Sequence, residues 1–173
     1  FGKLFENPDY RPDELKIYPM LVIPGTELHE LWKKGKYEPL TTDRFIDLLV
    51  EIKKLVPEYV RIKRVMRDIS EHESVAGANT TNIRQLAKMK MNFICKCILC
   101  REVGQNKVNT ENVRLQKIEY EASDGKEIFL SFVNLNNAGV TIVSKNDERV
   151  GGSLIIGYGT CCVALIIWTS DNG

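Results

Sequence analysis

Apolar side chains recur at intervals of three and four residues between Thr42 and Val56, and this pattern predicts an amphipathic helix. Thr42 is expected to cap the start of the helix, and Pro57 ends it because proline cannot continue a helix. Seven positions are predicted to form its apolar face: Phe45, Ile46, Leu48, Leu49, Ile52, Leu55 and Val56.

Two strands are expected on either side of this helix. The apolar run 15–23 predicts a buried strand, although Pro19 within it weakens the pairing. The run 59–69 is rich in β-branched residues and predicts a second strand. Between the first strand and the long helix, a shorter helix is expected from Thr26 to near Gly35. The order strand, helix, helix, strand is typical of the βα units at the end of a parallel barrel.

The pattern changes character in the second half of the chain. A helix from Asn79 or Thr80 to Met91 leads into a cysteine-rich loop. After Gly104, alternating apolar and polar residues over 113–120 predict a half-buried strand. Asp124 and the glycine that follows it form a strong hairpin signal, so 127–133 is expected to be the partner strand.

The end of the chain is harder to interpret. Residues 153–168 form an apolar run that is shorter than the roughly 20 residues a membrane helix needs. Its glycines favour two strands around residues 157–160 over a helix. Cys161 and Cys162 within it are interpreted as core residues, and no membrane association is expected.

The composition is that of a globular protein, with a formal net charge of +1 and five cysteines. An odd cysteine count without a signal peptide argues against a disulfide framework and favours a reducing, cytoplasmic setting. The chain begins with Phe1 and not with methionine, so we expect a fragment or a processed product. No nucleophile, base and acid set is recognisable, and no catalytic residue is assigned.

Basic residues concentrate in two stretches. The first, 53–67, carries six bases against Glu58 alone, and the second, 84–101, carries five bases and no acid. Such stretches are often solvated faces, but two of them beside a thiol cluster favour a polyanionic partner.

Cys95, Cys97 and Cys100 make the most specific motif of the chain. Thiols this close together favour a soft metal such as zinc, and the basic flank favours their thiolate form. The spacing differs from the Cys-x-x-Cys pair of redox sites, although redox chemistry and inert reduced thiols stay open. His29 and His72 are candidate fourth ligands, beside a water, an acidic side chain or a residue outside this chain.

Several runs together carry a resemblance to a known family. Residues 15–26 with 31–33, 65–69 and 82–86 resemble the late part of the radical-SAM domain of the Elongator catalytic-subunit family. The run from Cys95 to Gly104 is similar to the prokaryotic form of its zinc-binding linker, and 127–132 resembles the opening of its acetyltransferase domain. The runs occur in the family's order and cover about residues 10–133.

This resemblance implies an α/β fold in three parts. Residues 1–80 would be the end of a radical-SAM, partial TIM-like barrel, and 81–104 a helix with the zinc linker. Residues 105–173 would begin a GNAT-like α+β acetyltransferase domain, with a tail from about 134 that does not match. The tail lacks the family's glycine-rich pyrophosphate loop, which binds acetyl-CoA at a helix N-terminus.

The resemblance also implies a function. The family makes 5-carboxymethyl-type wobble uridine in tRNA, by radical chemistry from S-adenosylmethionine at an iron–sulfur cluster, with acetyl-CoA as the carbon source. The partners implied are tRNA, other Elongator subunits or a second copy. The family's iron–sulfur cysteines lie earlier, so the three clustered thiols are assigned to zinc, and the isolated chain is expected to be inactive. Six residues are assigned to tRNA: Arg61, Lys63, Arg64, Arg67, Lys96 and Arg101. The alternative is a zinc-organised RNA-binding module without catalysis.

Overall fold

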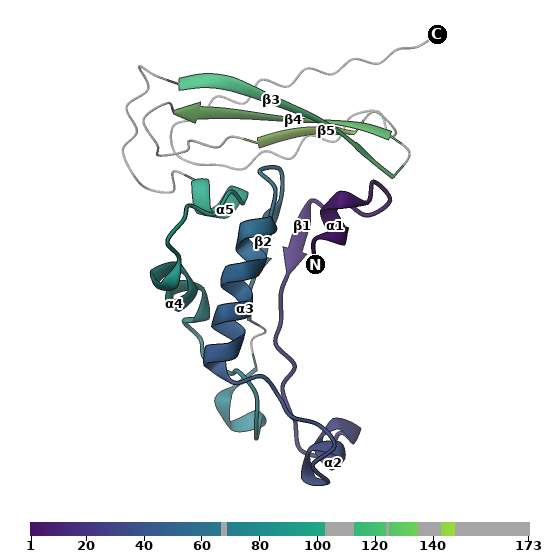
Figure 1. The fold of residues 1–173 in the computed structure, drawn as a ribbon, viewed down its shortest axis with the longest axis vertical. Helices are drawn as coiled ribbons and strands as arrows, with labels where there is room; N and C mark the ends of the chain where they lie inside the picture. Colours follow the sequence, from purple (N-terminus) through teal and green to yellow (C-terminus); the bar gives the residue numbers. More distant parts are fainter. Residues whose placement is uncertain (67–68, 103–112, 124, 135–142, 148–173) are drawn as a thin grey trace. The chain divides into compact units, whose positions relative to one another are not determined.

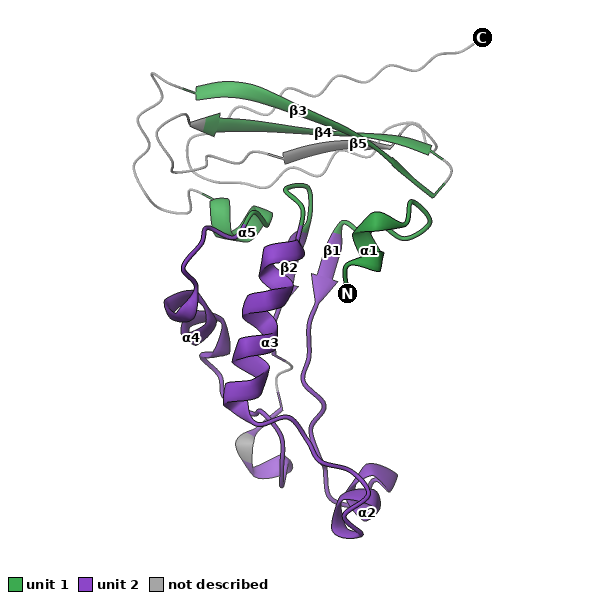
Figure 2. Ribbon diagram, viewed as in Figure 1, with its two compact units in different colours: residues 1–13, 57–60, 96–173 green, residues 14–56, 61–95 purple. Residues whose placement is uncertain are grey.

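The computed structural model describes residues 1–66, 69–102, 113–123, 125–134 and 143–147 (Figure 1). The chain divides into two compact units (Figure 2). Unit 1 comprises residues 1–13, 57–60 and 96–173, and unit 2 comprises residues 14–56 and 61–95. Arg67 and the apolar run 153–168 lie outside the described residues. The domain limits predicted at residues 80 and 104 stay predictions.

Unit 2 contains the order of elements that the sequence predicts. β1 (Glu14–Lys16) and β2 (Arg61–Arg64) pair in parallel, with Leu15 opposite Ile62. α2 (Glu27–Lys33) and α3 (Thr42–Leu55) lie between them in the sequence. Parallel neighbours need a crossover connection, which these two helices provide. The mixed α/β character predicted for this region is therefore confirmed.

The first strand is shorter than the apolar run predicts. Strand pairing ends at Lys16, before Pro19, which has no N–H to donate to a ladder. Val22 instead forms an isolated bridge with Ala76, in which the Val22 N–H donates to the Ala76 carbonyl at 2.9 Å. The apolar run therefore fills the core at Val22 without extending the strand.

The core of unit 2 lies against α3. The side chains of Phe45, Leu49 and Ile52 are buried, whereas Leu48 and Leu55 are 45% and 51% exposed. Ile46 and Val56 are buried as well. Five of the seven positions predicted for the apolar face are therefore buried.

The cap of α3 differs from the prediction by one residue. The Thr41 hydroxyl accepts the Arg44 N–H at 3.4 Å, so Thr41 is the cap and Thr42 begins the helix. The Thr26 cap of α2 is confirmed, because its hydroxyl accepts the His29 N–H at 3.2 Å. Adjacent threonines are equally good caps by type, so sequence alone did not separate them.

Within the described part of the predicted strand 59–69, the strand comprises the four residues of β2. A short 3₁₀ turn (Glu71–Glu73) and a loop follow, and α4 (Ile83–Lys90) then packs on α3. The loop depends on Gly77, whose φ is +112°, and a Cβ there would lie 2.8 Å from the Met20 carbonyl oxygen. The sequence predicted that Asn79 or Thr80 caps the helix, but the Asn79 amide donates to the Ser74 hydroxyl and the Thr80 hydroxyl lies 3.4 Å from that of Thr42, and α4 begins only at Ile83.

Unit 1 contains an antiparallel sheet in the order β3-β4-β5. β3 (Val113–Ala122) pairs with β4 (Gly125–Asn134) over ten residues, which confirms the predicted hairpin, and β5 (Val143–Asp147) lies on the other side of β4. The unit also holds the short helices α1 (Lys3–Glu6) and α5 (Ile98–Arg101).

Two contacts tie distant segments to the hairpin of unit 1. Tyr59 stacks on Tyr120 of β3, with ring centroids 3.9 Å apart. Burial raises the pKa of both phenols above the usual value, so both stay neutral near pH 7. Arg11 donates to the Phe5 carbonyl at 3.0 Å and to the Glu121 carbonyl at 2.8 Å, which holds the N-terminal turn at the end of β3. Among the described residues, no helix is long and apolar enough to span a membrane.

Candidate metal centre and basic surface

The cysteine loop, residues 95–101, is folded by its own backbone. Cys97 has an extended conformation and immediately precedes α5, and the Cys100 N–H donates to the Cys97 carbonyl at 3.1 Å. This single turn brings residues three apart onto one side. The Ile98 N–H donates to the Val60 carbonyl at 2.9 Å, which anchors the start of the turn.

The three sulfurs form a metal-type cluster. Their Sγ atoms all lie within 4.8 Å of one another, Cys95 and Cys97 are buried, and Cys100 is half-buried. A tetrahedral zinc with bonds of about 2.3 Å separates its sulfur ligands by about 3.8 Å, so small side-chain adjustments would accommodate the ion. None of the three is in a disulfide. The donor set could therefore hold a metal ion, and its assignment to zinc stays a prediction.

Neither histidine belongs to this cluster. Among the described residues, the metal-type group contains only Cys95, Cys97 and Cys100. His29 instead stacks on Trp32, and its Nδ1 lies 3.4 Å from the Gly25 N–H, which donates to it. His72 is exposed on the 3₁₀ turn. The fourth ligand is thus not one of the two histidines in this arrangement.

A lysine that the sequence motifs did not reveal lies next to the cluster. Lys53 of α3 is only 2% exposed, and its Nζ donates to Cys95 Sγ at 3.7 Å. It occupies the buried stripe of the helix, four residues after Leu49. Its position on that stripe could have indicated that Lys53 is buried, whereas counting basic residues does not distinguish a buried lysine from a solvated one.

Arg101 closes the loop from the other end. Its Nε donates to the Lys96 carbonyl at 2.6 Å, and one terminal nitrogen donates to the Glu58 carbonyl at 2.5 Å. Its side chain is 11% exposed, and its other terminal nitrogen lies 3.9 Å from the Glu58 carboxylate. Lys96, by contrast, is exposed. The structure therefore places Arg101 within the loop's own framework, whereas Lys96 faces solvent.

The basic strand β2 presents cations to solvent. Ile62 is fully buried between Arg61, which is half-buried, and Lys63, which is exposed, and Arg64 is exposed as well. Lys63 pairs with Glu14 of β1 at 2.5 Å. Arg84 of α4 braces the strand, since one of its terminal nitrogens donates to the Ile62 carbonyl at 2.9 Å and to the Lys63 carbonyl at 3.3 Å.

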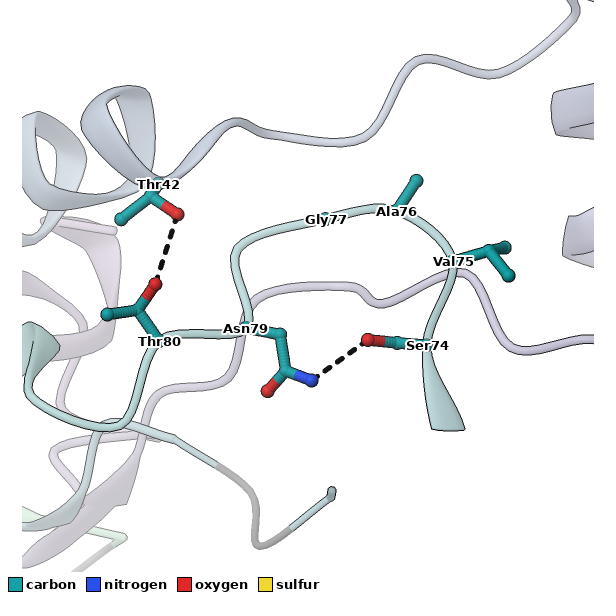
Figure 3. Close-up of a pocket in the computed structure, with 7 residues that line it drawn as sticks. All are labelled: Thr42, Ser74, Val75, Ala76, Gly77, Asn79 and Thr80. Carbon is teal, nitrogen blue, oxygen red and sulfur yellow. Dashed lines mark hydrogen bonds between the residues drawn. The ribbon is translucent and has the colours of Figure 1, made fainter. Parts of the chain in front are cut away.

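A polar pocket of about 360 Å³ lies elsewhere in unit 2 (Figure 3). Its lining comprises Thr42, residues 74–77, Asn79 and Thr80. The Thr42 and Thr80 hydroxyls lie 3.4 Å apart, and the Asn79 amide donates to the Ser74 hydroxyl at 2.9 Å. These polar side chains hydrogen-bond to one another. The residues that line the pocket include no acid, base or thiol that could take part in catalysis.

Comparisons with known proteins identify relatives of this chain. Residues 12–93 match the family described as the Radical_SAM C-terminal domain. The chain is 42% identical over 146 residues to the tRNA uridine(34) acetyltransferase of Methanocaldococcus jannaschii, a match that covers 79% of this chain and 27% of that protein. It is 43% identical over 139 residues to Elongator complex protein 3 of Saccharomyces cerevisiae, covering 76% of this chain and 25% of that protein.

A solved structure shows the same fold. The archaeal Methanocaldococcus infernus Elp3, with an N-terminal deletion, superposes with a TM-score of 0.78 at 38% identity, over 84% of this chain and 36% of that chain. The chain thus spans about a quarter of the length of the curated relatives it matches. By sequence and by fold, the chain belongs to the family of the tRNA uridine(34) acetyltransferases and Elongator complex proteins 3.

Proposed function

We propose that this chain is part of an enzyme that modifies the wobble uridine of tRNA. The observation that carries the proposal is the 42% identity to a protein named tRNA uridine(34) acetyltransferase, over 79% of this chain. In the proposed reaction, a radical generated from S-adenosylmethionine at an iron–sulfur cluster attaches an acetyl-CoA-derived carbon to uridine C5. Other Elongator subunits or a second copy are the proposed protein partners.

We assign the chain a structural and RNA-binding share of that reaction. Zinc held by Cys95, Cys97 and Cys100 stabilises the cysteine loop, since structural zinc contributes directly to folding energy. These thiols are assigned to zinc and not to the iron–sulfur cluster, so the isolated chain is proposed to have no activity. The acetyltransferase character of residues after 104 belongs to the same proposal.

The tRNA surface is proposed to centre on β2. Arg61, Lys63 and Arg64 are the neighbouring cations of this strand, and exposed Lys96 of unit 1 is proposed to contact tRNA as well. Arg67 belongs to the set by sequence and lies outside the described residues. Arg101, which donates to the Lys96 and Glu58 carbonyls, is proposed to contribute indirectly by holding the loop that carries Lys96. Lysine and arginine contacts to phosphates supply most of the affinity in such interfaces.

Charge reversal tests this surface. The triple variant Arg61→Glu, Lys63→Glu and Arg64→Glu is compared with Lys33→Glu, Lys34→Glu and Lys36→Glu, three exposed lysines in the same unit. Filter binding to tRNA is measured from 50 to 200 mM salt. We expect the β2 variant to weaken binding about 10- to 100-fold and to reduce the salt slope by about 0.7–0.9 for each phosphate that is no longer neutralised. Equal weakening in both variants would refute a specific role for β2.

The alternative is an RNA-binding module without catalysis, favoured by the coexistence of the thiol cluster and the exposed cations in one short chain. Transfer of label from acetyl-CoA to tRNA by the full-length protein separates the two functions. Label at uridine 34 supports the enzyme. Tight binding of tRNA and of an unrelated hairpin alike, without transfer by a protein loaded with its iron–sulfur cluster, supports the module.

A further inference from the structure

We propose that Lys53 is a positioning residue for the metal centre, whose ammonium group holds the Cys95 thiolate and balances the charge of the thiolate cluster. The inference rests on the proposed zinc site and adds a residue from α3 to it. Its starting point is one contact, the hydrogen bond that Lys53 Nζ donates to Cys95 Sγ over 3.7 Å.

Burial of Lys53 requires an electrostatic reason. Lysine is almost never fully buried without a partner, because removing an ammonium group from water is energetically unfavourable. Lys53 is 2% exposed and Cys95 is 1% exposed, so the contact is shielded from solvent on both sides. The neighbouring Lys54 shows the ordinary behaviour, since its side chain is 45% exposed and pairs with Glu51 on the surface.

The charge of the proposed centre supplies that reason. Three thiolates around one divalent cation leave a net charge of −1, before any contribution from a fourth ligand. A single ammonium group at hydrogen-bond distance from one sulfur offsets this charge in a region of low polarity. Groups that hydrogen-bond to metal ligands fix the orientation of those ligands and strengthen metal binding.

The position of Lys53 on a regular helix suits it to hold the Cys95 side chain in a fixed orientation. It lies in the last turn of α3, on the stripe that also buries Leu49 and Val56. The buried neighbours restrict the lysine stem, so the ammonium group is presented to Cys95 in one place. A methionine would fill nearly the same volume and would keep the apolar contacts, but it has no charge and no donor.

Metal competition tests the role. Wild type, Lys53→Met, Lys53→Arg and the control Lys54→Met are purified as the full chain with zinc, and zinc is then competed away with a chromogenic chelator. We expect Lys53→Met to weaken zinc affinity about 10- to 100-fold, as removal of such supporting groups does in other metal proteins. Lys53→Arg should recover most of the affinity because it restores a charged donor, and Lys54→Met should match wild type.

A second measurement separates charge from packing. In the zinc-loaded chain, Lys53→Met should lower the melting temperature. In a background with Cys95, Cys97 and Cys100 all changed to Ser, the same change should lower it much less, because the thiolate that the ammonium group faces is gone. Lowering of equal size in both backgrounds would show a packing role and overturn the inference. This background also decides the question if Lys53→Met does not fold with the cysteines present.

The outcomes distinguish this inference from the zinc site beneath it. A wild-type chain that binds no zinc under reducing conditions overturns the metal centre and this inference with it. A wild-type chain that binds one zinc, while Lys53→Met binds it with unchanged affinity, overturns the role of Lys53 and leaves the zinc site intact.

Discussion

The two basic stretches of this chain resemble each other in sequence and differ in what their cations do. In the first, residues 53–67, Arg61, Lys63 and Arg64 lie along β2 with exposed or half-buried side chains. In the second, residues 84–101, the two arginines bind backbone carbonyls: Arg84 those of β2, and Arg101 those of the cysteine loop and Glu58.

The difference shows that the number of bases in a stretch does not measure a binding surface. A guanidinium group has five donors in a fixed plane, so it can brace several carbonyls that secondary structure leaves unpaired. The donors used in this way hold the fold and are not offered to a phosphate. The same reasoning explains Lys53, which belongs to the exposed stretch by sequence and to the buried core by structure.

The largest expected effect comes from removing a thiol at the centre of the second stretch. Cys97 is fully buried, so Cys97→Ser should abolish stoichiometric zinc binding and cost at least about 4 kcal/mol of unfolding free energy. Elemental analysis and thermal melting check both, and a fall in melting temperature of about 10 °C is expected. Hydrogen exchange should quicken over residues 85–102. Unchanged zinc content and melting would show that the loop is held by its arginine and not by a metal.

Arg101 and Lys96 divide the second stretch into a structural and a solvated cation. Arg101→Gln removes two charge-assisted hydrogen bonds and should cost about 3 kcal/mol, whereas Lys96→Gln should change stability by less than about 0.5 kcal/mol. Denaturant unfolding of the two variants measures the difference. If both substitutions lowered the free energy of unfolding equally, the hydrogen bonds of Arg101 to backbone carbonyls would add no stability beyond that of an exposed cation.

Elements with a strong local period were predictable from the sequence. α3 followed from its three- and four-residue spacing, and the β3–β4 hairpin followed from alternation on either side of Asp124 and Gly125. The strand expected over 15–23 was too long, because an apolar run shows burial and does not show a pairing partner. The actual partner of Val22 is Ala76, which is distant in the sequence.

The candidate site was predictable in its ligands and not in its supports. The cluster of Cys95, Cys97 and Cys100 follows from spacing within six residues, which a single turn brings together. The supports come from far along the chain: Lys53 is 42 residues from Cys95, and the Glu58 carbonyl is 43 residues from Arg101. The pattern of side chains along a sequence does not show which distant residue or backbone carbonyl a lysine or an arginine will contact. The supporting roles of Lys53 and Arg101 therefore became visible only in the structure.

Arg84 links the two basic stretches, because it lies in the second and donates hydrogen bonds to β2 of the first. Its hydrogen bonds to the Ile62 and Lys63 carbonyls hold the strand that carries the exposed cations. Arg84→Lys keeps the charge and loses the planar arrangement of donors, so we expect a cost of about 1–2 kcal/mol. Denaturant unfolding measures that cost, and filter binding at fixed salt should show less than a threefold change in tRNA affinity. A larger loss of affinity than of stability would mean that Arg84 itself contacts RNA.

The smallest expected effect concerns Glu119, a carboxylate outside both basic stretches that pairs with two lysines. Glu119 of β3 lies between Lys117 and Lys126, and it accepts from Lys126 at 2.5 Å. Hydrogen bonds from Lys117 and then from Lys126 lower the pKa of the Glu119 carboxyl to about 2. The carboxylate is therefore favoured in the folded state, and its contribution is present above about pH 4.5 and is lost as the pH falls toward 2.

Glu119→Gln tests how little such an exposed pair contributes. The side chain is 37% exposed, so the stabilisation above pH 4.5 should be at the lower limit of detection. Melting curves at pH 3 and pH 7 should show wild type losing slightly more stability on acidification than Glu119→Gln, with Glu121→Gln as an exposed control on the same strand. If Glu119→Gln lowered stability at pH 7 as much as Arg101→Gln does, burial and carbonyl contacts would not distinguish structural cations from solvated ones.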